Sequence, residues 1–345
     1  MPIAIDAMGG DSAPQAAVEG AFRAATEDGC SVLLVGDRVR VEAELRKLGD
    51  ADGRIETVHA EEVVGMDEPA ITPIRKKRRS SLRLCAELVK EGRAQAMVTA
   101  GNTGAAMAVA KMVIGTVAGV DRPALAAVLP NAKGKTVLLD VGANVDSKAI
   151  HLREFAVMGH FYAQEVIGTP SPRIGLMSIG EEEGKGTDLT REAYKLLKTM
   201  GLNFAGNVEG RDVFSGEVDV VVCDGFVGNV LLKSAEALAE LMRRMLREEI
   251  TGAAGGKLGY LLAKGAFERF RQRTDYSEYG GAPLLGVNGG CIISHGRSNA
   301  KAIKNAIRVA RDFAVNHMDE KIRDKISDLH RREHESALVA ERSGE

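Results

Sequence analysis

The chain has 345 residues, a formal net charge of −2 and a hydrophobic content of 45%. These values predict an ordinary soluble globular protein with one large or two smaller domains, and they exclude a molecule that binds nucleic acid over its whole surface. The four cysteines are dispersed without a C-x-x-C pair. We therefore expect reduced thiols in the cytoplasm, no disulfide framework and no zinc site.

The N-terminal part alternates short apolar strands with helices. Strands are expected at 3–6, 31–36 and 54–59, with helices at 14–28 and 39–48 between them. This alternation predicts parallel strands joined by right-handed crossovers. The opening residues become polar too early for a signal peptide, and no apolar stretch approaches the ~20 residues that a spanning helix needs.

A dense basic run, Arg75 to Arg79, stands at the start of a helix that we expect to end near Glu91. Cations at a helix N-terminus oppose the helix dipole, so helix propensity does not explain the run. It is either a solvated face or a contact for an anionic ligand or an acidic protein.

Four loops rich in glycine and polar residues follow apolar strands, at 99–104, 138–146, 177–186 and 220–229. The first leads directly into an apolar helix, whose free N–H groups would offer an anion site. Because such loops gather along one edge of an open parallel sheet, we expect the four to share one site. The alternative is that each loop merely makes a turn.

The second half of the chain contains a predicted hairpin and two long helices. Strands at 124–129 and 135–140 indicate an antiparallel hairpin within an otherwise parallel sheet. An amphipathic helix is expected from 229 to 250. A last helix, from about 298 to 329, keeps one face apolar, which is typical of a bundle or a dimer interface.

These elements divide the chain into four parts. We expect a sheet domain with strand-end loops over 1–228, a helical protrusion over 229–275, returning strands and a long C-terminal helix over 276–334, and a disordered tail over 335–345.

Several familiar site motifs are absent. The stretch Gly180–Thr187 resembles a phosphate-binding P-loop, but it is one residue short and carries three glutamates. No dinucleotide fingerprint, metal motif or nucleophile elbow follows a strand. The polar residues at the ends of the predicted strands are instead suited to binding a small anion and stabilising an oxyanion without a protein nucleophile. This set comprises Asn102, Thr103, Asn144, Asn229, Asp6, Asp11, Asp140, Asp224 and Lys185.

The motifs as a set resemble those of the bacterial acyl-ACP–phosphate acyltransferases, in which ACP is acyl carrier protein. The resemblance runs in order from residue 3 to about 315. Its motifs are Ile5–Asp11, Ser80-Ser81, Ala100–Gly104, Asp121–Leu125, Asp140–Asp146, Gly184–Gly186, Asp224–Asn229, Tyr276–Ala282 and His295-Gly296.

The resemblance implies an α/β fold with a doubly wound, mostly parallel sheet like that of isocitrate dehydrogenases and phosphotransacetylases, with a protruding helical segment. It implies transfer of a long-chain fatty acyl group from acyl carrier protein to inorganic phosphate, without a cofactor or metal. The acyl phosphate would feed a membrane glycerol-3-phosphate acyltransferase in phospholipid synthesis. A cytoplasmic homodimer, peripherally associated with the membrane, is also implied.

Within this reaction, we assign phosphate binding to Asn102, Thr103 and Gly104, and charge neutralisation to Lys185. Asn144 and Asn229 are candidate donors to the oxyanion or the thioester. His295 either protonates the leaving thiolate or is structural. The loop carboxylates Asp140 and Asp224 complete the predicted binding residues.

The stretch 257–273 is both apolar and basic. It contains Leu258, Leu261 and Leu262, and its five basic residues against Glu268 give a local charge of +4. We expect it to contact an anionic membrane surface. The alternative is a helix that packs in a bundle or a dimer with its basic residues facing water.

Three other functions stay open at this point. A phosphate acetyl- or butyryltransferase would use acyl-CoA with much the same residues. An isocitrate-type dehydrogenase would need the missing dinucleotide fingerprint. A non-catalytic scaffold for a membrane or carrier protein would show no phosphate-dependent turnover.

Overall fold

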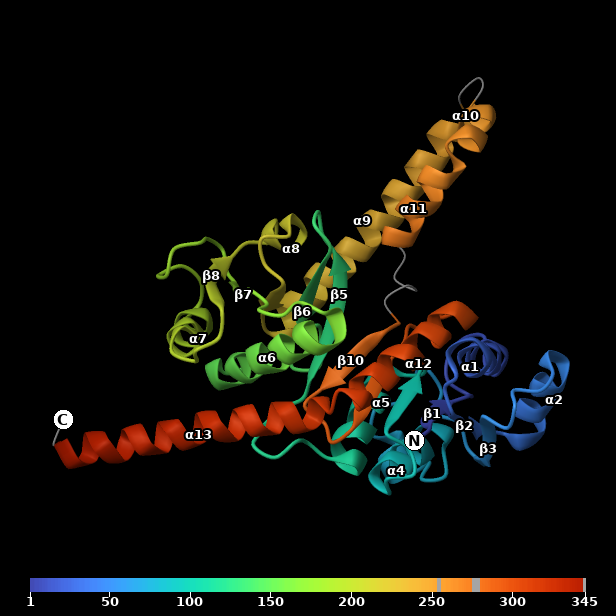
Figure 1. Ribbon diagram of the computed structural model, residues 1–345, viewed down its shortest axis with the longest axis horizontal. Helices are drawn as coiled ribbons and strands as arrows, with labels where there is room; N and C mark the ends of the chain where they lie inside the picture. Colours follow the sequence, from blue (N-terminus) through green and yellow to red (C-terminus); the bar gives the residue numbers. More distant parts are fainter. Residues whose placement is uncertain (253–255, 275–279, 344–345) are drawn as a thin grey trace.

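The computed structural model describes residues 1–252, 256–274 and 280–343, with side chains described except at 256–258, 271–274 and 332–343. Within these residues the central feature is an 11-stranded sheet in the order β3-β2-β1-β4-β11-β10-β5-β6-β9-β7-β8 (Figure 1). Helices cover both of its faces, so the α/β fold expected from the sequence is confirmed.

The first block of the sheet consists of five mutually parallel strands. They are β1 (Ile3–Asp6), β2 (Val32–Gly36), β3 (Ile55–His59), β4 (Ala96–Thr99) and β11 (Gly290–Ile293). Helices α1 (Gln15–Asp28) and α12 (Ala300–Val315) pack on one face. Helices α4 (Ser81–Lys90) and α5 (Thr103–Val109), with the π-helix η1 (Ala110–Ile114) that continues α5, pack on the other. The other helices of this block are α2 (Arg38–Leu48) and the short α3 (Thr72–Arg75).

The second block consists of four further parallel strands. They are β6 (Lys135–Leu139), β9 (Val220–Val222), β7 (Ile174–Met177) and β8 (Phe204–Val208). Its helices are α6 (Ala149–Tyr162), the π-helix η2 (Ala163–Ile167), α7 (Asp188–Lys198) and α8 (Asp212–Ser215).

Two strands join the blocks and reverse the direction of the sheet. Strand β5 (Ala124–Pro130) is antiparallel to β6, which confirms the predicted hairpin, and β10 (Ala282–Leu285) is antiparallel to both β5 and β11. Three successive antiparallel pairings make the second block run opposite to the first. The prediction that all four glycine-rich loops gather along one edge is therefore wrong. The loops after β4 and β11 lie at one end of the strands, and the loops after β6, β7 and β9 lie at the opposite end.

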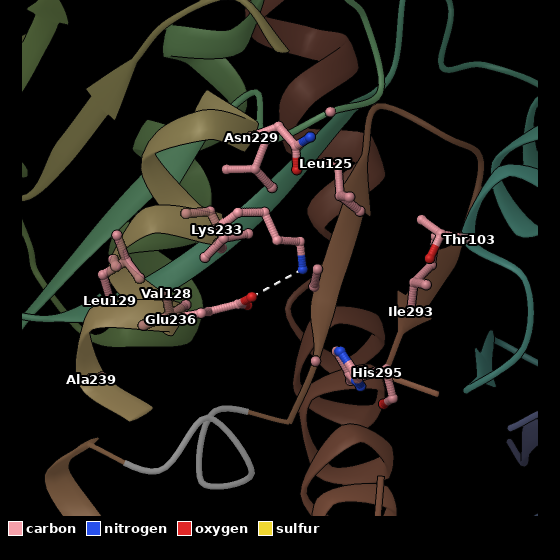
Figure 2. A pocket seen from close by; sticks show the side chains of 18 of the residues that line it. Thr103, Leu125, Val128, Leu129, Asn229, Lys233, Glu236, Ala239, Ile293 and His295 are labelled. Atoms are coloured by element: carbon pink, nitrogen blue, oxygen red, sulfur yellow. Dashed lines mark hydrogen bonds and ion pairs between the residues drawn. The ribbon is translucent and has the colours of Figure 1, made fainter. Parts of the chain in front are cut away.

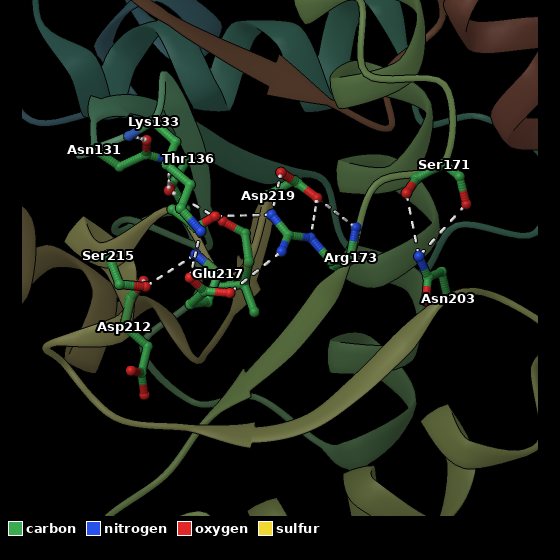
Figure 3. A network of polar contacts seen from close by, with 12 residues as sticks. Asn131, Lys133, Thr136, Ser171, Arg173, Asn203, Asp212, Ser215, Glu217 and Asp219 are labelled. Carbon is green, nitrogen blue, oxygen red and sulfur yellow. Dashed lines mark hydrogen bonds and ion pairs between the residues drawn. The ribbon is translucent and has the colours of Figure 1, made fainter.

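A polar network fixes the strand starts of the second block (Figure 3). The Arg173 guanidinium donates to both carboxylate oxygens of Asp219 at 3.0 and 3.1 Å, and to the Gly216 carbonyl at 2.8 Å. The Asn131 amide donates to the Thr136 hydroxyl at 2.8 Å, and that hydroxyl donates to the Val213 carbonyl. The first set ties the start of β7 to that of β9, and the second ties the β5–β6 hairpin to α8, so we read this network as structural.

Three helices project from the body as an arm (Figure 1): α9 (Gly225–Gly252), α10 (Gly256–Leu262) and α11 (Lys264–Thr274). Helix α9 begins a full turn before Asn229, where we expected its start. The apolar and basic stretch forms two helices that are separated at Ala263. Among the described residues, no helix is both long enough and apolar enough to cross a bilayer.

Three other expectations need correction. The single C-terminal helix is in fact α12 and α13 (Met318–Ser343), separated by Asn316 and His317, the latter with a positive φ of 50°. Helix α13 packs against α6 and extends past residue 335, where we expected a disordered tail. The basic run lies mostly between α3 (Thr72–Arg75) and α4, so it does not oppose the dipole of a long helix.

Candidate active site

A pocket of about 530 Å³ lies over the sheet where its two blocks join (Figure 2). Its floor is one apolar face of the joining strands, with Leu125, Ala127 and Leu129 from β5, Ala282 from β10 and Ile293 from β11. One wall is α5, and the opposite wall is α9. The α9 wall consists of Asn229, Leu232, Lys233, Ala235, Glu236 and Ala239.

Loops from both edges of the sheet reach this pocket. Thr103 and Gly104 come from the loop and helix after β4, and Ser294 and His295 follow β11. Gly142 follows β6, and Asn229 belongs to the helix after β9. Three of the four predicted glycine-rich loops thus meet in one pocket, although they start from opposite edges. They meet because the pocket lies over β5 and β10, at the line where the strand direction reverses.

At the start of α5, the Asn102 side chain is engaged by the protein itself. Its Oδ1 accepts the Ala105 N–H at 2.9 Å, and its Nδ2 donates to the Met66 and Glu68 carbonyls at 2.7 and 2.9 Å. Asn102 therefore holds the helix start against the preceding loop. Thr103 and Gly104 are the residues of this loop that line the pocket, and first-turn N–H groups have no partner within their helix.

The loop after β6 is built around the buried Asp140 carboxylate. Its two oxygens accept the N–H groups of Leu125, Gly142, Ala143 and Asn144 at 2.6–3.2 Å. The Asn144 amide adds a bond at 2.9 Å and also donates to the Pro123 carbonyl. Burial raises the pKa of Asp140. Both side chains shape the loop from within, so neither is placed to contact a ligand as we had predicted.

The start of α9 rests directly on this loop. The Asp224 carboxylate accepts the N–H groups of Phe226 and Val227 at 3.0 and 2.9 Å, so Asp224 caps the helix. A Cβ on Gly228 would lie 1.9 Å from the Asp140 carbonyl oxygen, which means that only glycine fits there. This close approach fixes the position of the helix start. Asn229 therefore lies in the pocket lining, next to Gly142.

His295 and Ser294 lie at the end of β11. The His295 Nδ1 accepts the Arg297 N–H at 3.1 Å, which places the proton of a neutral ring on Nε2. The buried Ser294 hydroxyl has no hydrogen-bond partner among the described residues. Sequence reasoning missed Ser294, although it stands beside His295 at the same strand end.

The predicted cationic residue, Lys185, and a second lysine that the structure adds are placed differently. Lys185 is exposed in the loop after β7 and does not line the pocket. Its side chain forms no ion pair with any described residue. Lys233, which sequence reasoning missed, lines the pocket but is paired with Glu236 at 2.9 Å. The role of Lys185 stays a prediction.

The cysteines do not provide a nucleophile. All four are buried, and none lines the pocket. Burial raises the pKa of Cys85 and Cys223 well above the ordinary value, and that of Cys291 to about 12. Thiolates are therefore disfavoured at neutral pH. Among the residues described, no cluster of three His, Cys, Asp or Glu side chains is arranged to hold a metal ion.

At the end of the arm, α10 exposes large apolar side chains. Leu261 and Leu262 are 65% and 82% exposed, and Tyr260 is also exposed. Leu258, the third residue of the predicted membrane contact, lies outside the described side chains.

Comparison with known proteins supplies the family. Residues 1–321 match the model of a family described as fatty acid synthesis protein. The phosphate acyltransferase of Trichlorobacter lovleyi is 54% identical over 328 residues, which cover 95% of each chain. That of Pelobacter propionicus is 54% identical over 332 residues, covering 96% of this chain and 95% of the relative.

Solved structures agree on the fold. A phosphotransacetylase from Streptococcus pyogenes superposes with a TM-score of 0.60 at 20% identity, and the EutD phosphotransacetylase from Staphylococcus aureus with 0.61 at 16%. Each match covers 91% of this chain and 94% of the other. The sequence matches extend over nearly the whole chain, and on that basis it belongs to the phosphate acyltransferase family of fatty acid synthesis proteins.

Proposed function

We propose that the protein transfers a long-chain acyl group from acyl carrier protein to inorganic phosphate and releases an acyl phosphate. One observation carries this proposal. A single pocket combines polar groups at strand-end loops with an apolar groove along β5 and α9. Inorganic phosphate needs the polar groups, and a fatty acyl thioester needs the apolar groove. The names of the relatives support acyl transfer to phosphate.

The chemistry needs no acyl-enzyme intermediate. A phosphate oxygen attacks the thioester carbonyl carbon, the new C–O bond forms, and the C–S bond breaks as the tetrahedral intermediate collapses. The thiolate leaves and takes a proton from solvent, which is feasible because a thiol has a pKa of about 8.5. The enzyme aligns the two substrates and stabilises the oxyanion. We place phosphate near Thr103, Gly104 and the Ser294 hydroxyl.

We assign the oxyanion to His295, and Asn229, which lines the pocket at the start of α9, stays a candidate donor to the substrate. The Asn229 amide is a donor, and because Nδ1 of His295 accepts the Arg297 N–H, a neutral His295 ring carries its proton on Nε2 and can donate it. A neutral imidazole is a good hydrogen-bond donor but a very weak acid. His295 therefore suits oxyanion stabilisation better than the protonation of the thiolate that we first considered.

The acidic carrier protein needs a basic surface, and the run after α3 offers one. Lys77 and Arg79 already pair with Glu68 and Glu61, whereas Arg75, Lys76 and Arg78 are exposed and have no ion pair with another described residue. We propose the three exposed cations as the docking contacts.

The arm suits a second copy and a membrane. Leu238, Met242 and Met245 form an exposed apolar stripe on α9, which we assign to a homodimer contact. The exposed leucines of α10 we assign to an anionic membrane surface, where the acyl phosphate would pass to a glycerol-3-phosphate acyltransferase. We place the enzyme in the cytoplasm.

The test is the loss of thioester from palmitoyl-ACP as phosphate is varied, without added metal or nucleotide. We expect saturable dependence on phosphate and acyl phosphate as the primary product. Equal thioester loss without phosphate, or free fatty acid as the primary product, would refute the reaction. A preference for palmitoyl-CoA over palmitoyl-ACP would refute the assigned donor.

A further inference from the structure

The pocket adjoins a second apolar cavity beneath the arm. The second cavity is lined by residues of the β5–β6 turn, by Phe214 of α8, and by Ala266, Arg269 and Phe270 of α11. Pro130 and Phe214 line both cavities. An apolar path therefore leads from the polar loops along β5 to the base of the arm.

Polarity changes across the pocket in one direction. In Figure 2, Thr103 and His295 lie on one side, while Val128, Leu129 and Ala239 lie on the other. On this second side the lining between β5 and α9 is aliphatic, apart from the Lys233–Glu236 pair. A thioester at the polar loops would thus direct its acyl chain toward Leu129 and Phe214.

The dimensions of this groove fit an extended chain. Helix α9 advances ~15 Å from Asn229 to Ala239 at 1.5 Å per residue. Strand β5 advances ~17 Å from Leu125 to Pro130. The two elements border the same pocket over these segments. A groove bordered by both elements over this length accommodates an extended polymethylene chain, and its far end would bury only the terminal carbons of a long one.

We propose that Ala235 and Ala239 determine the length of acyl chain that the enzyme accepts, an inference that rests on the function proposed above. The two alanines are four residues apart, so they stand on one face of α9 and follow each other along the groove. Both are half-buried in the wall. Their small side chains leave the space in which we place the distal part of the acyl chain.

The test introduces larger side chains at these two depths. Ala239→Leu blocks the distal part of the groove, and Ala235→Leu blocks it closer to Asn229. Ala237→Leu is the matched control, because Ala237 is exposed on the same helix and does not line the pocket. Thermal unfolding of each variant verifies the fold, and kcat/KM is measured with butyryl-, octanoyl- and palmitoyl-ACP.

We expect Ala239→Leu to lower kcat/KM for the palmitoyl donor at least ~10-fold while leaving butyryl transfer near the wild-type rate, since overpacking excludes only a chain that reaches it. Ala235→Leu should impair octanoyl transfer as well. A folded Ala239→Leu enzyme with the wild-type chain-length profile would overturn the inference. Absence of phosphate-dependent transfer by the wild type at every chain length would instead refute the proposed function.

Discussion

Asn229 and His295 come from opposite blocks of the sheet, and both line the pocket. Asn229 is carried by the first turns of α9, which glycine at position 228 allows to rest on the Asp140 carbonyl. His295 is held by the bond from the Arg297 N–H to its Nδ1. Each side chain is thus positioned by backbone that lies outside the pocket lining.

The proposed role of His295 can be tested with two substitutions. Removing a well-placed oxyanion donor lowers kcat by about 10²-fold, and we expect this loss for His295→Ala. His295→Gln keeps an N–H donor but cannot transfer a proton, so we expect it to retain at least ~10-fold more activity than the alanine variant. Steady-state kcat with palmitoyl-ACP is the measurement. Equal losses in the two variants would favour the proton-transfer role.

Lys185 gives a second test at this scale. Its side chain has no ion-pair partner among the described residues, whereas the charge of Lys233 is offset by Glu236. We expect Lys185→Ala to lower kcat by at least ~10²-fold with the fold intact. Lys233→Met, the comparison variant, should cost less than ~10-fold. The reverse order would transfer the cationic role to Lys233, which lines the pocket.

Four predicted ligand residues illustrate what sequence cannot resolve at single positions. Asn102 and Asp224 cap helices, and Asp140 and Asn144 bond their own loop. Asn and Asp are favoured at such caps for the same reason that they bind ligands, because short polar side chains reach nearby N–H groups. Only the observed bonds separate the two uses.

At the scale of elements, the sequence predicted most strands and helices, but not the order and direction of the strands in the sheet. Short apolar runs bounded by glycine predicted the strands of both blocks. The antiparallel hairpin over 124–140 was also predicted correctly. The reversal depends on β10, which lies more than 140 residues from β5 in the chain and pairs with it. Pairing over such a separation leaves no local periodicity to read.

Helix α10 of the arm exposes large apolar side chains, and it carries the membrane proposal. We expect Leu261→Glu together with Leu262→Glu to reduce co-sedimentation with anionic vesicles several-fold, since both leucines are largely exposed on α10. Val39→Glu is the control, because Val39 is an exposed aliphatic residue on α2. A folded double variant that co-sediments as well as wild type would remove these leucines from the contact.

At the scale of the whole molecule, a net charge of −2 leaves recognition of an acidic carrier to a local surface. We expect Lys76→Glu with Arg78→Glu to raise KM for acyl-ACP several-fold at low ionic strength, and added salt to weaken the wild-type interaction. Lys195→Glu with Lys198→Glu makes the same charge change on α7 as a control. An unchanged KM in the first variant would place the carrier elsewhere.

In the proposed reaction, phosphate itself attacks the thioester, without an acylated enzyme. The most direct measurement is the intact mass of the protein after incubation with stoichiometric palmitoyl-ACP, first without phosphate and then after its addition. We predict an unmodified chain and intact thioester in the first sample, followed by one equivalent of acyl phosphate in the second. A covalent acyl adduct on the chain, or equal thioester loss before phosphate is added, would contradict the account.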